Sequence, residues 1–556
     1  MTTPETILHS GTVLTLDSAG RTATALALHG DRITAVGDSA ALRATAGPRT
    51  RQVDLAGRTV MPGFFDAHAH MDREGLKRCA GDPIGHCRSI AEIQQVVAAA
   101  VARRKPGEWV LLLPMGAPPH GYLSRPDQLE DGRFPDRHDL DKVSPDNPVY
   151  IRAPWGWWSR PPFPSVANSA ALARAGITRD TRAPFRTEIL HDAQGEPTGV
   201  FLERNFTPIL EYTLFRCVPR FTEADRAASV ALGAAAYAEA GTTAIYEGHG
   251  VTPALLTAFR ETRARDGLPL RATLPLSVPT AAFDDDRIEA LLMHWADRLG
   301  GAGWGDDRLR AEGLCLDVGD PDLARIIAGH YPYEQWAGHF YQSLPQDRLV
   351  TIGEIAARLG MRVNCLVCYD LERVLSAYEE IDRRVSIRDR RWTVVHVVDA
   401  SDAQIERMAR LGVIATVTPN FMFMAEDRFG IDKLRERAIP IRRLMDAGVP
   451  VALSSDGVPY SMLWTMWEAL ARWDDDSQSR LGDSGLSRDA ALRIAAQSGH
   501  LLNFAEDRLG VLEPGRAADF VVLDDNPMTC DEAKLPDIPV HASYVAGRQV
   551  AGAGVG

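Results

Sequence analysis

Cysteine is scarce in this chain. Its 556 residues include seven cysteines, an odd and dispersed number, whereas small secreted domains held by disulfides carry a dense, even set. This scarcity excludes a disulfide-linked scaffold. The one close pair, Cys365 and Cys368, lies in an apolar strand-like stretch and not before a helix. We therefore interpret it as two reduced core thiols and not as a redox motif.

Long apolar runs and an excess of basic residues are also missing. No stretch of about 18 apolar residues occurs, so the sequence predicts no membrane-spanning helix. The first residues show no basic segment followed by an apolar one, which favours a cytoplasmic location. Asp and Glu number 74 against 61 Lys and Arg, for a net charge of −13. Nucleic acids and anionic membranes bind basic surfaces, so we expect neither as a partner.

What is present is the composition of a large soluble protein, with 45% hydrophobic and 24% charged residues. Short runs rich in β-branched residues, separated by tight turns, fill residues 5–60, and similar strand-like runs occur at 519–523 and 542–550. Two β-rich ends predict one small β-sandwich domain, residues 1–60 plus 505–556, built from both termini. The alternative is two separate β appendages.

Between these ends, residues 61–504 alternate apolar strand-like runs with helical stretches, which indicates a parallel α/β fold. Helical spacing is clear over 402–411, where Ile405, Met408 and Leu411 share one face. About eight such units is the number in a (β/α)8 TIM barrel, which we predict here. A Gly-, Pro- and Trp-rich insertion is expected around 114–165. The candidate strands are 149–152, 242–247, 270–276, 313–318, 361–368, 392–398, 413–418 and 451–455.

The most informative motif ends the apolar run at 60–70, where His68 and His70 stand one residue apart. Residues i and i+2 of a strand point to the same face, so both imidazoles can reach one point past the strand end. Imidazole suits zinc and similar ions, and a catalytic site needs about three protein ligands with one open position. Alone the pair is a weak signal, because surface histidines can share this spacing.

Other strand-like runs also end in titratable residues: His396, Asp456, and the pair Glu247 and His249. Barrel enzymes carry their catalytic residues at the carboxyl ends of strands, so these positions predict a site of a divalent metal ion. Histidine and aspartate ligands accept Zn²⁺, Mn²⁺, Fe²⁺, Co²⁺ or Ni²⁺, so the residues do not fix which ion is bound. Such an ion lowers the pKa of water from about 15.7 toward about 7. Asp456 would accept the water proton and return it to the leaving group. His396 would ligate the ion or polarise a substrate carbonyl.

Further segments complete a recognisable pattern, at 62–70, 166–172, 195–200, 394–396, 452–456 and 507–523. With them the chain resembles the metal-dependent amidohydrolase superfamily, in particular amidohydrolase family 3, which includes N-substituted formamide deformylase-like and YtcJ-like proteins. The resemblance implies a distorted (β/α)8 barrel with a small β domain, one or two divalent ions, usually zinc, and a dimer or larger homo-oligomer. It assigns ligand roles on the first and last strands to His68, His70 and Asp456. It gives His396 the role of the sixth-strand histidine.

The chain departs from the family pattern at two strands. In the fifth-strand stretch 364–370, Leu366 stands where a histidine is usual, and Cys315 stands where the fourth strand often carries a metal-bridging lysine. Either the site holds one ion, or other groups replace these ligands. The candidates are a Cys315 thiolate, Glu247 and His249; the plain alternative for Cys315 is a buried strand cysteine.

The family resemblance implies hydrolysis of a non-peptide C–N bond in a small amide, formamide or cyclic amide. A deaminase or other hydrolase of a cyclic substrate with a single ion is the alternative, and a non-catalytic barrel without metal is a third hypothesis. Aromatic residues near the site favour an apolar substrate group, although they can also serve as lid packing. The candidate substrate-binding residues are Trp155, Trp157, Trp158, Asn420 and Phe421.

Overall fold

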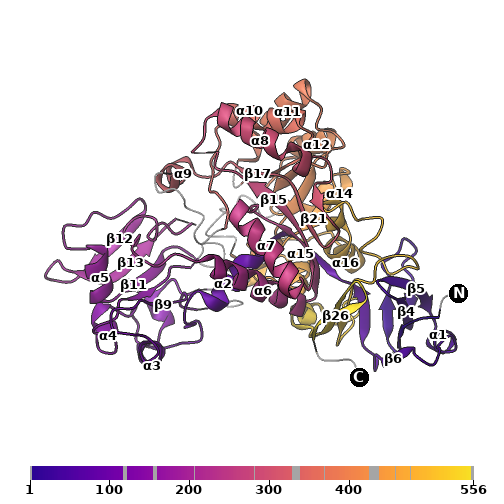
Figure 1. Cartoon of the computed structure of the whole chain (residues 1–556), viewed down its shortest axis with the longest axis horizontal. Coiled ribbons are helices and arrows are strands. Elements are labelled where there is room, and N and C mark those ends of the chain that lie inside the picture. The colour runs from indigo at the N-terminus through magenta and orange to yellow at the C-terminus, as the bar shows by residue number, and fades with distance from the viewer. Residues whose placement is uncertain are drawn as a thin grey trace. The chain divides into compact units, whose positions relative to one another are not determined.

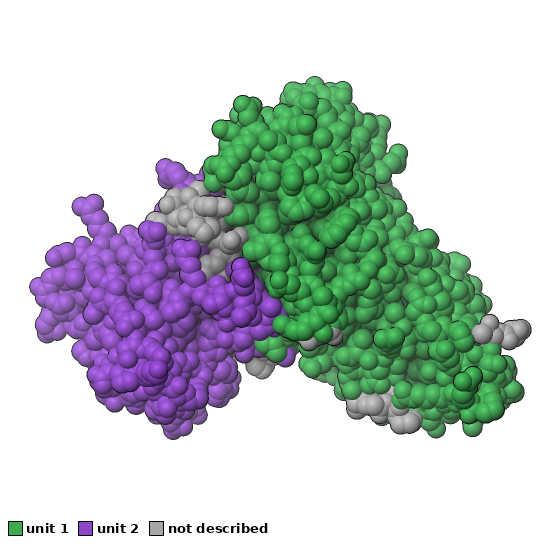
Figure 2. Space-filling view, viewed as in Figure 1, with its two compact units in different colours: residues 1–72, 230–319, 338–556 green, residues 73–229, 320–337 purple. Residues whose placement is uncertain are grey.

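The computed structural model of the chain describes residues 3–116, 122–154, 160–205, 207–280, 282–328, 338–367, 370–424, 437–457, 459–475 and 477–552. The chain forms two compact units (Figure 2). Unit 1 comprises residues 1–72, 230–319 and 338–556, and unit 2 comprises residues 73–229 and 320–337. Among the described helices, none has the length and apolar character needed to cross a membrane.

A barrel of eight parallel strands lies in unit 1, as predicted (Figure 1). Each strand pairs in parallel with the next along the chain. The last strand returns to the first where the backbone N–H of Ser455 donates to Oδ1 of Asp66 at 3.0 Å. The strands are β8 (Phe64–Ala69), β14 (Thr242–Glu247), β15 (Arg271–Ser277), β17 (Leu309–Asp317), β18 (Val363–Leu366), β19 (Thr393–Val395), β20 (Ile414–Val417) and β21 (Val451–Leu453). Two short additions are β16 (Trp304–Gly305), which pairs with β17, and the hairpin β22 (Trp473–Asp474) and β23 (Ser479–Arg480).

Helices alternate with these strands. Helix α12 (Asp402–Leu411) illustrates how the sequence sets the ends of these helices. The Ser401 side chain accepts the N–H of Gln404 at the start of the helix, and Gly412 ends the helix with a φ of 68°. Its buried residues are Ile405, Met408 and Leu411, as predicted. The other helices in the described part of unit 1 are α1 (Ser39–Arg43), α7 (Pro253–Asp266), α8 (Asp285–Leu299), α10 (Gln346–Arg358), α11 (Leu371–Arg384), α14 (Ile441–Asp446), α15 (Met462–Ala471) and α16 (Arg488–Ala496), with the 3-10 turns η3 (Pro419–Met424), η5 (Ser498–Leu501) and η6 (Glu532–Asp537).

Both chain ends contribute to one pair of sheets, which confirms the composite β domain. One sheet has the order β5-β4-β1-β6, and the other has the order β26-β25-β24-β7-β2-β3. Leu8 of the first sheet and Phe520 of the second share one buried core. The strands are β1 (Thr6–His9), β2 (Thr12–Leu14), β3 (Thr22–Ala23), β4 (Ala25–His29), β5 (Arg32–Gly37), β6 (Arg51–Asp54), β7 (Thr59–Pro62), β24 (Phe520–Leu523), β25 (Val540–Val545) and β26 (Arg548–Gly552).

Unit 2 is built on a five-stranded sheet of order β12-β13-β11-β10-β9. It includes the described part of the insertion expected around 114–165. The strands are β9 (Val110–Leu112), β10 (Val149–Ile151), β11 (Phe163–Ala167), β12 (Thr187–His191) and β13 (Pro197–Glu203). The helices are α3 (Ile90–Val101), α4 (Arg137–Asp141), α5 (Ser169–Ala175) and α9 (Pro321–Ala328), with η1 (Pro126–Gln128). Two further helices, α2 (Met71–Cys79) and α6 (Glu223–Glu239), cross the unit boundaries.

The prediction that residues 149–152 form a barrel strand is wrong. Val149–Ile151 form β10, which pairs with β9 and β11 inside the unit 2 sheet. Val149 and Ile151 pack into one core, and Tyr150 packs into the core on the other face. A strand buried on both faces has the same apolar sequence in a barrel and in a covered open sheet, so periodicity does not separate the two.

One buried carboxyl makes the stability of unit 2 depend on pH. Glu203, at the end of β13, is buried, and its Oε1 accepts the N–H of Ile209 at 2.8 Å. Burial raises its pKa from 4.5 to about 8. Between these two values the folded state keeps a proton that the unfolded chain has lost. The stabilisation is therefore complete below pH 4.5 and is lost as the pH rises toward 8.

We expect Glu203→Gln, which keeps an oxygen acceptor for Ile209, to remove this pH dependence. The free energy of unfolding at pH 8 should rise by about 2–4 kcal/mol relative to the unchanged protein, with little difference at pH 5. Urea unfolding followed by circular dichroism at both pH values measures the effect. Glu188→Gln, on the exposed side of β12, is the matched control. An equal effect of Glu203→Gln at both pH values would contradict the prediction.

Candidate metal centre

Three imidazoles and one carboxylate converge at the carboxyl end of the barrel. His68 lies in β8 and His70 directly follows it, while His249 follows β14 and Asp456 follows β21. One possible ligand atom from each lies within 4.8 Å of those from the other three. Oδ1 of Asp456 is 2.7 Å from Nε2 of His70 and 3.5 Å from Nε2 of His68. We refer to these four residues as the ligand group.

The ligand group fits a divalent ion in its chemistry. Imidazole nitrogens and a carboxylate oxygen are donors that zinc and similar ions accept. His68, His70 and Asp456 are buried, and His249 is half-buried. Gathering these side chains out of water costs free energy unless a strong partner, such as a cation, compensates for the lost solvation. The site therefore has the residues to hold one metal ion.

Gly248 makes room for the ligand group. A Cβ atom at this position would lie 2.5 Å from Nε2 of His68 and 2.6 Å from Cε1 of His70. Such contacts are shorter than van der Waals distances, so any side chain here would displace the imidazoles. The carbonyl oxygen of Gly248 also accepts a hydrogen bond from Nδ2 of Asn364 at 3.0 Å. This bond fixes the backbone from which His249 projects.

Cys315 lies outside the ligand group. Its thiol donates to the carbonyl oxygen of Gly248 at 3.7 Å, and its side chain packs with Leu366 and Val395. This arrangement matches the alternative of a buried strand cysteine. Leu366, which stands where the family usually has a histidine, is part of the same apolar cluster.

Two carboxylates support the ligand histidines. Oε1 of Glu247 lies 3.1 Å from Nδ1 of His70, so Glu247 sits behind a ligand and outside the group itself. A carboxylate in this place would fix which ring nitrogen faces a bound ion. Asp66 accepts the N–H groups of His68 at 3.1 Å and Ser455 at 3.0 Å, and also the Ser455 hydroxyl. Burial raises the pKa of Asp66 to about 6. Asp66 thus joins the segments that carry His68 and Asp456.

His396 lies beside the ligand group but is not a member of it. Its ring centroid is 4.3 Å from that of His68, and its Nδ1 is 3.0 Å from Oγ1 of Thr418. His396 and Asp456 both adopt left-handed backbone conformations, with φ of 63° and 55°. Such conformations are costly for non-glycine residues and concentrate at functional sites. The same conformation also occurs at described residues such as Ser10 and Ala56, so the backbone alone does not single out the two catalytic candidates.

The candidate substrate-binding residues divide into two sets. Trp155, Trp157 and Trp158 lie outside the described residues. Phe421, in η3, has its ring centroid 5.1 Å from that of His396 and therefore supplies apolar surface next to it. The Nδ2 of Asn420 donates to the carbonyl oxygens of Ser455 at 3.1 Å and Pro459 at 3.3 Å. Asn420 thus holds the segment around Asp456, a structural use that the sequence did not reveal.

His339 lies at the site but is not recognisable from the sequence. Its Nε2 lies 2.9 Å from Nδ1 of His249, and its side chain is buried. No strand-like run precedes it and no recognisable spacing links it to another ligand, so only the fold brings it to the site. The role of Gly248 was missed for the same reason, because a glycine requirement depends on neighbours from β8.

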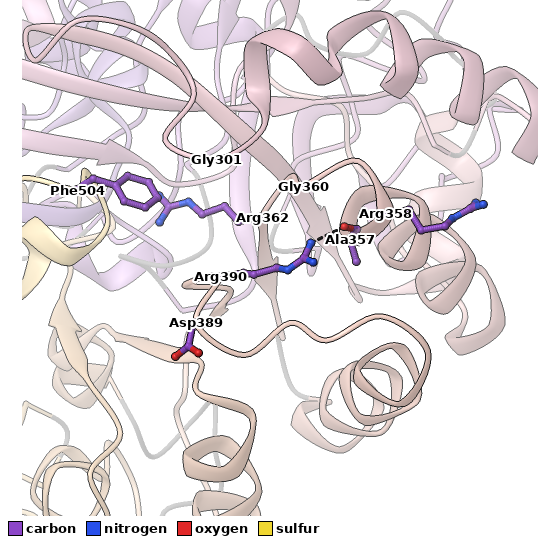
Figure 3. Close-up of a pocket in the computed structure, with 8 residues that line it drawn as sticks. All are labelled: Gly301, Ala357, Arg358, Gly360, Arg362, Asp389, Arg390 and Phe504. Atoms are coloured by element: carbon purple, nitrogen blue, oxygen red, sulfur yellow. Dashed lines mark hydrogen bonds between the residues drawn. The ribbon is translucent and has the colours of Figure 1, made fainter.

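A cavity of about 270 Å³ occurs elsewhere in unit 1 (Figure 3). Its lining includes Arg362, which directly precedes β18, so it opens at the amino ends of the strands. The side chain of Arg390 donates to the carbonyl oxygen of Ala357 there. No member of the ligand group lines this cavity. Barrel enzymes react at the opposite, carboxyl ends, where the ligand group lies.

Comparisons with known proteins agree with this geometry. The model of the amidohydrolase family matches residues 51–551. The chain is 26% identical to an N-substituted formamide deformylase of Arthrobacter pascens, over 96% of each chain. A metal-dependent hydrolase from Pyrococcus horikoshii has a similar structure, with a TM-score of 0.67 and 20% identity over 95% of this chain and 99% of that one. The atrazine chlorohydrolase TrzN of Arthrobacter aurescens, crystallised with zinc, gives a TM-score of 0.52 at 15% identity over 98% and 95%. The chain belongs to the amidohydrolase family.

Proposed function

We propose that the chain is a zinc-dependent hydrolase that cleaves a non-peptide C–N bond in a small amide, formamide or cyclic amide. The observation that carries the proposal is the convergence of His68, His70, His249 and Asp456 at the carboxyl end of the barrel. Zinc is supported by the donor set and by its presence in the similar atrazine chlorohydrolase. C–N cleavage is supported by similarity to the formamide deformylase along nearly the whole chain.

The residues present can perform such a hydrolysis. A divalent ion in the ligand group supplies Lewis acidity, which makes water a competent nucleophile near neutral pH. Asp456 accepts the water proton as the C–O bond forms and delivers it to the nitrogen as the C–N bond breaks. His396, beside His68, is placed to donate a hydrogen bond to the carbonyl oxygen that gains negative charge. Phe421 offers apolar contact to the substrate.

We propose one ion per chain. Within the described parts of the chain, one group of three or more metal-binding side chains is found. The thiol of Cys315 is engaged with the carbonyl of Gly248, and Glu247 contacts Nδ1 of His70. Cys315 and Glu247 are therefore not placed to bind a second ion.

Metal analysis tests the proposal directly. Protein purified without chelators should contain about one equivalent of zinc per chain. Removing the metal should abolish hydrolysis of N-substituted formamides, and added Zn²⁺ should restore it. A metal content near zero that added ion does not raise would contradict the proposal and favour a non-catalytic barrel. Two equivalents would contradict the single-ion assignment.

A deaminase or other hydrolase of a cyclic substrate is the second candidate, because it would use the same single ion in the ligand group. Product analysis separates the two functions. Release of an amine with formate or a carboxylate indicates amide hydrolysis, whereas release of ammonia from a ring indicates deamination.

A further inference from the structure

We propose that His339 is a positioning residue of the metal centre, which holds the His249 imidazole so that its Nε2 faces the ion. The inference rests on the proposed function. Nδ1 of His249 and Nε2 of His339 are 2.9 Å apart, within hydrogen-bond distance. The two ring centroids lie 4.3 Å apart, and the ring planes cross at 72°. His339 is 2% exposed, so water does not compete freely for this contact.

The hydrogen bond decides which nitrogen of His249 remains for the ion. An imidazole that binds a metal through one nitrogen carries a proton on the other and donates it to an acceptor. With Nδ1 of His249 directed at His339, Nε2 is the atom left for the ligand group. Glu247 contacts Nδ1 of His70 in the same way and so leaves Nε2 of His70 for the ion. His339 therefore supports His249, the histidine of the ligand group that lies outside the motif of His68 and His70.

His249 needs such support more than His68 does. His68 lies within β8, whose parallel pairing with β14 fixes its backbone. His249 lies beyond the end of β14 and is half-buried. A side chain on a connecting segment loses more conformational entropy when it is held in one orientation. A buried partner such as His339 reduces the number of orientations that the ring can adopt.

The segment that carries His339 is itself anchored to the barrel. The N–H of Thr252 donates to the carbonyl of Gly338 at 3.1 Å. The N–H of Phe340 donates to Oγ of Ser277, in β15, at 2.9 Å. The N–H of Gln342 donates to Oδ2 of Asp317, in β17, at 3.0 Å. These bonds lie on both sides of His339, so its ring is held from a fixed backbone.

Zinc affinity of three variants tests the inference. We expect His339→Leu to weaken zinc binding by about 10–100-fold, as loss of a supporting group generally does. His339→Gln, whose Oε1 can accept from Nδ1 of His249, should stay within about threefold of the unchanged protein. Phe340→Leu alters packing in the same segment and should also stay within that range. Competition with a chromophoric chelator gives the affinities, and thermal unfolding of the metal-free proteins checks that each variant folds.

The absorption spectrum of the cobalt-substituted protein provides a second readout. It should change in His339→Leu and match the unchanged protein in His339→Gln. Equal zinc affinities of His339→Leu and the unchanged protein, or equal losses in the Leu and Gln variants, would overturn the inference and leave the proposed function intact. A failure of the unchanged protein to bind zinc would instead overturn the proposed function.

Discussion

Gly248→Ala is expected to abolish metal binding without unfolding the barrel. The added methyl group would lie 2.5 Å from Nε2 of His68 and 2.6 Å from Cε1 of His70, so both imidazoles must leave the positions that they hold in the ligand group. Because two ligands are displaced at once, the loss of zinc affinity should exceed about 100-fold, the upper value for losing one supporting group. Hydrolysis should be lost together with the metal. Chelator competition and metal analysis measure the effect.

Gly37→Ala is the matched control, because a Cβ at that position meets no atom within 4 Å. It should bind zinc like the unchanged protein. Circular dichroism of Gly248→Ala should show the normal helix and strand content. Zinc affinity within about tenfold of normal in Gly248→Ala would show that the ligand group can shift to accept the methyl group, and the assignment of His68 and His70 as ligands would then need revision.

Asp456→Asn is expected to lower kcat by about 10²–10⁴-fold, the usual contribution of a positioned acid–base group. The amide keeps the size of the carboxylate but cannot accept the proton of water at neutral pH. The assay should be run with saturating Zn²⁺ and bound zinc measured in parallel, since Oδ1 of Asp456 also contacts His70. A variant that holds zinc yet turns over slowly separates proton transfer from metal binding.

Asp402→Asn provides the control for this substitution, because the side chain of Asp402 is exposed on α12 and forms an ion pair with Arg443. Its kcat should match that of the unchanged protein. Normal turnover by zinc-loaded Asp456→Asn would exclude Asp456 as the proton acceptor and direct attention to another group near the ion.

The local patterns predicted the barrel and the composite β domain well. Helix α12 shows its face, its start and its end within one short stretch, because spacing and capping are local properties. Local patterns did not predict which strands belong to unit 2. Its strand β10 and a barrel strand are both short and buried on two faces, and only long-range pairing with β9 and β11 distinguishes them.

The same distinction applies to the ligand group. His68 and His70 are recognisable because the spacing of two along a strand is itself the geometric requirement. Asp456 is recognisable because it ends a strand-like run. His249 was one of several possible replacements, and His339 carried no signal, because their roles depend on a contact between segments that are distant in the chain.

The division of unit 1 into three chain segments has a consequence for biosynthesis. His68 and His70 belong to the first segment, and Asp456 belongs to the last. At about 5–20 residues per second, the ribosome makes these residues on the order of tens of seconds apart. During that interval β8 is without β21, although residues 73–229 of unit 2 are already complete. Until then the incomplete barrel exposes an apolar strand edge, and the ligand group can form only after Asp456 has been made.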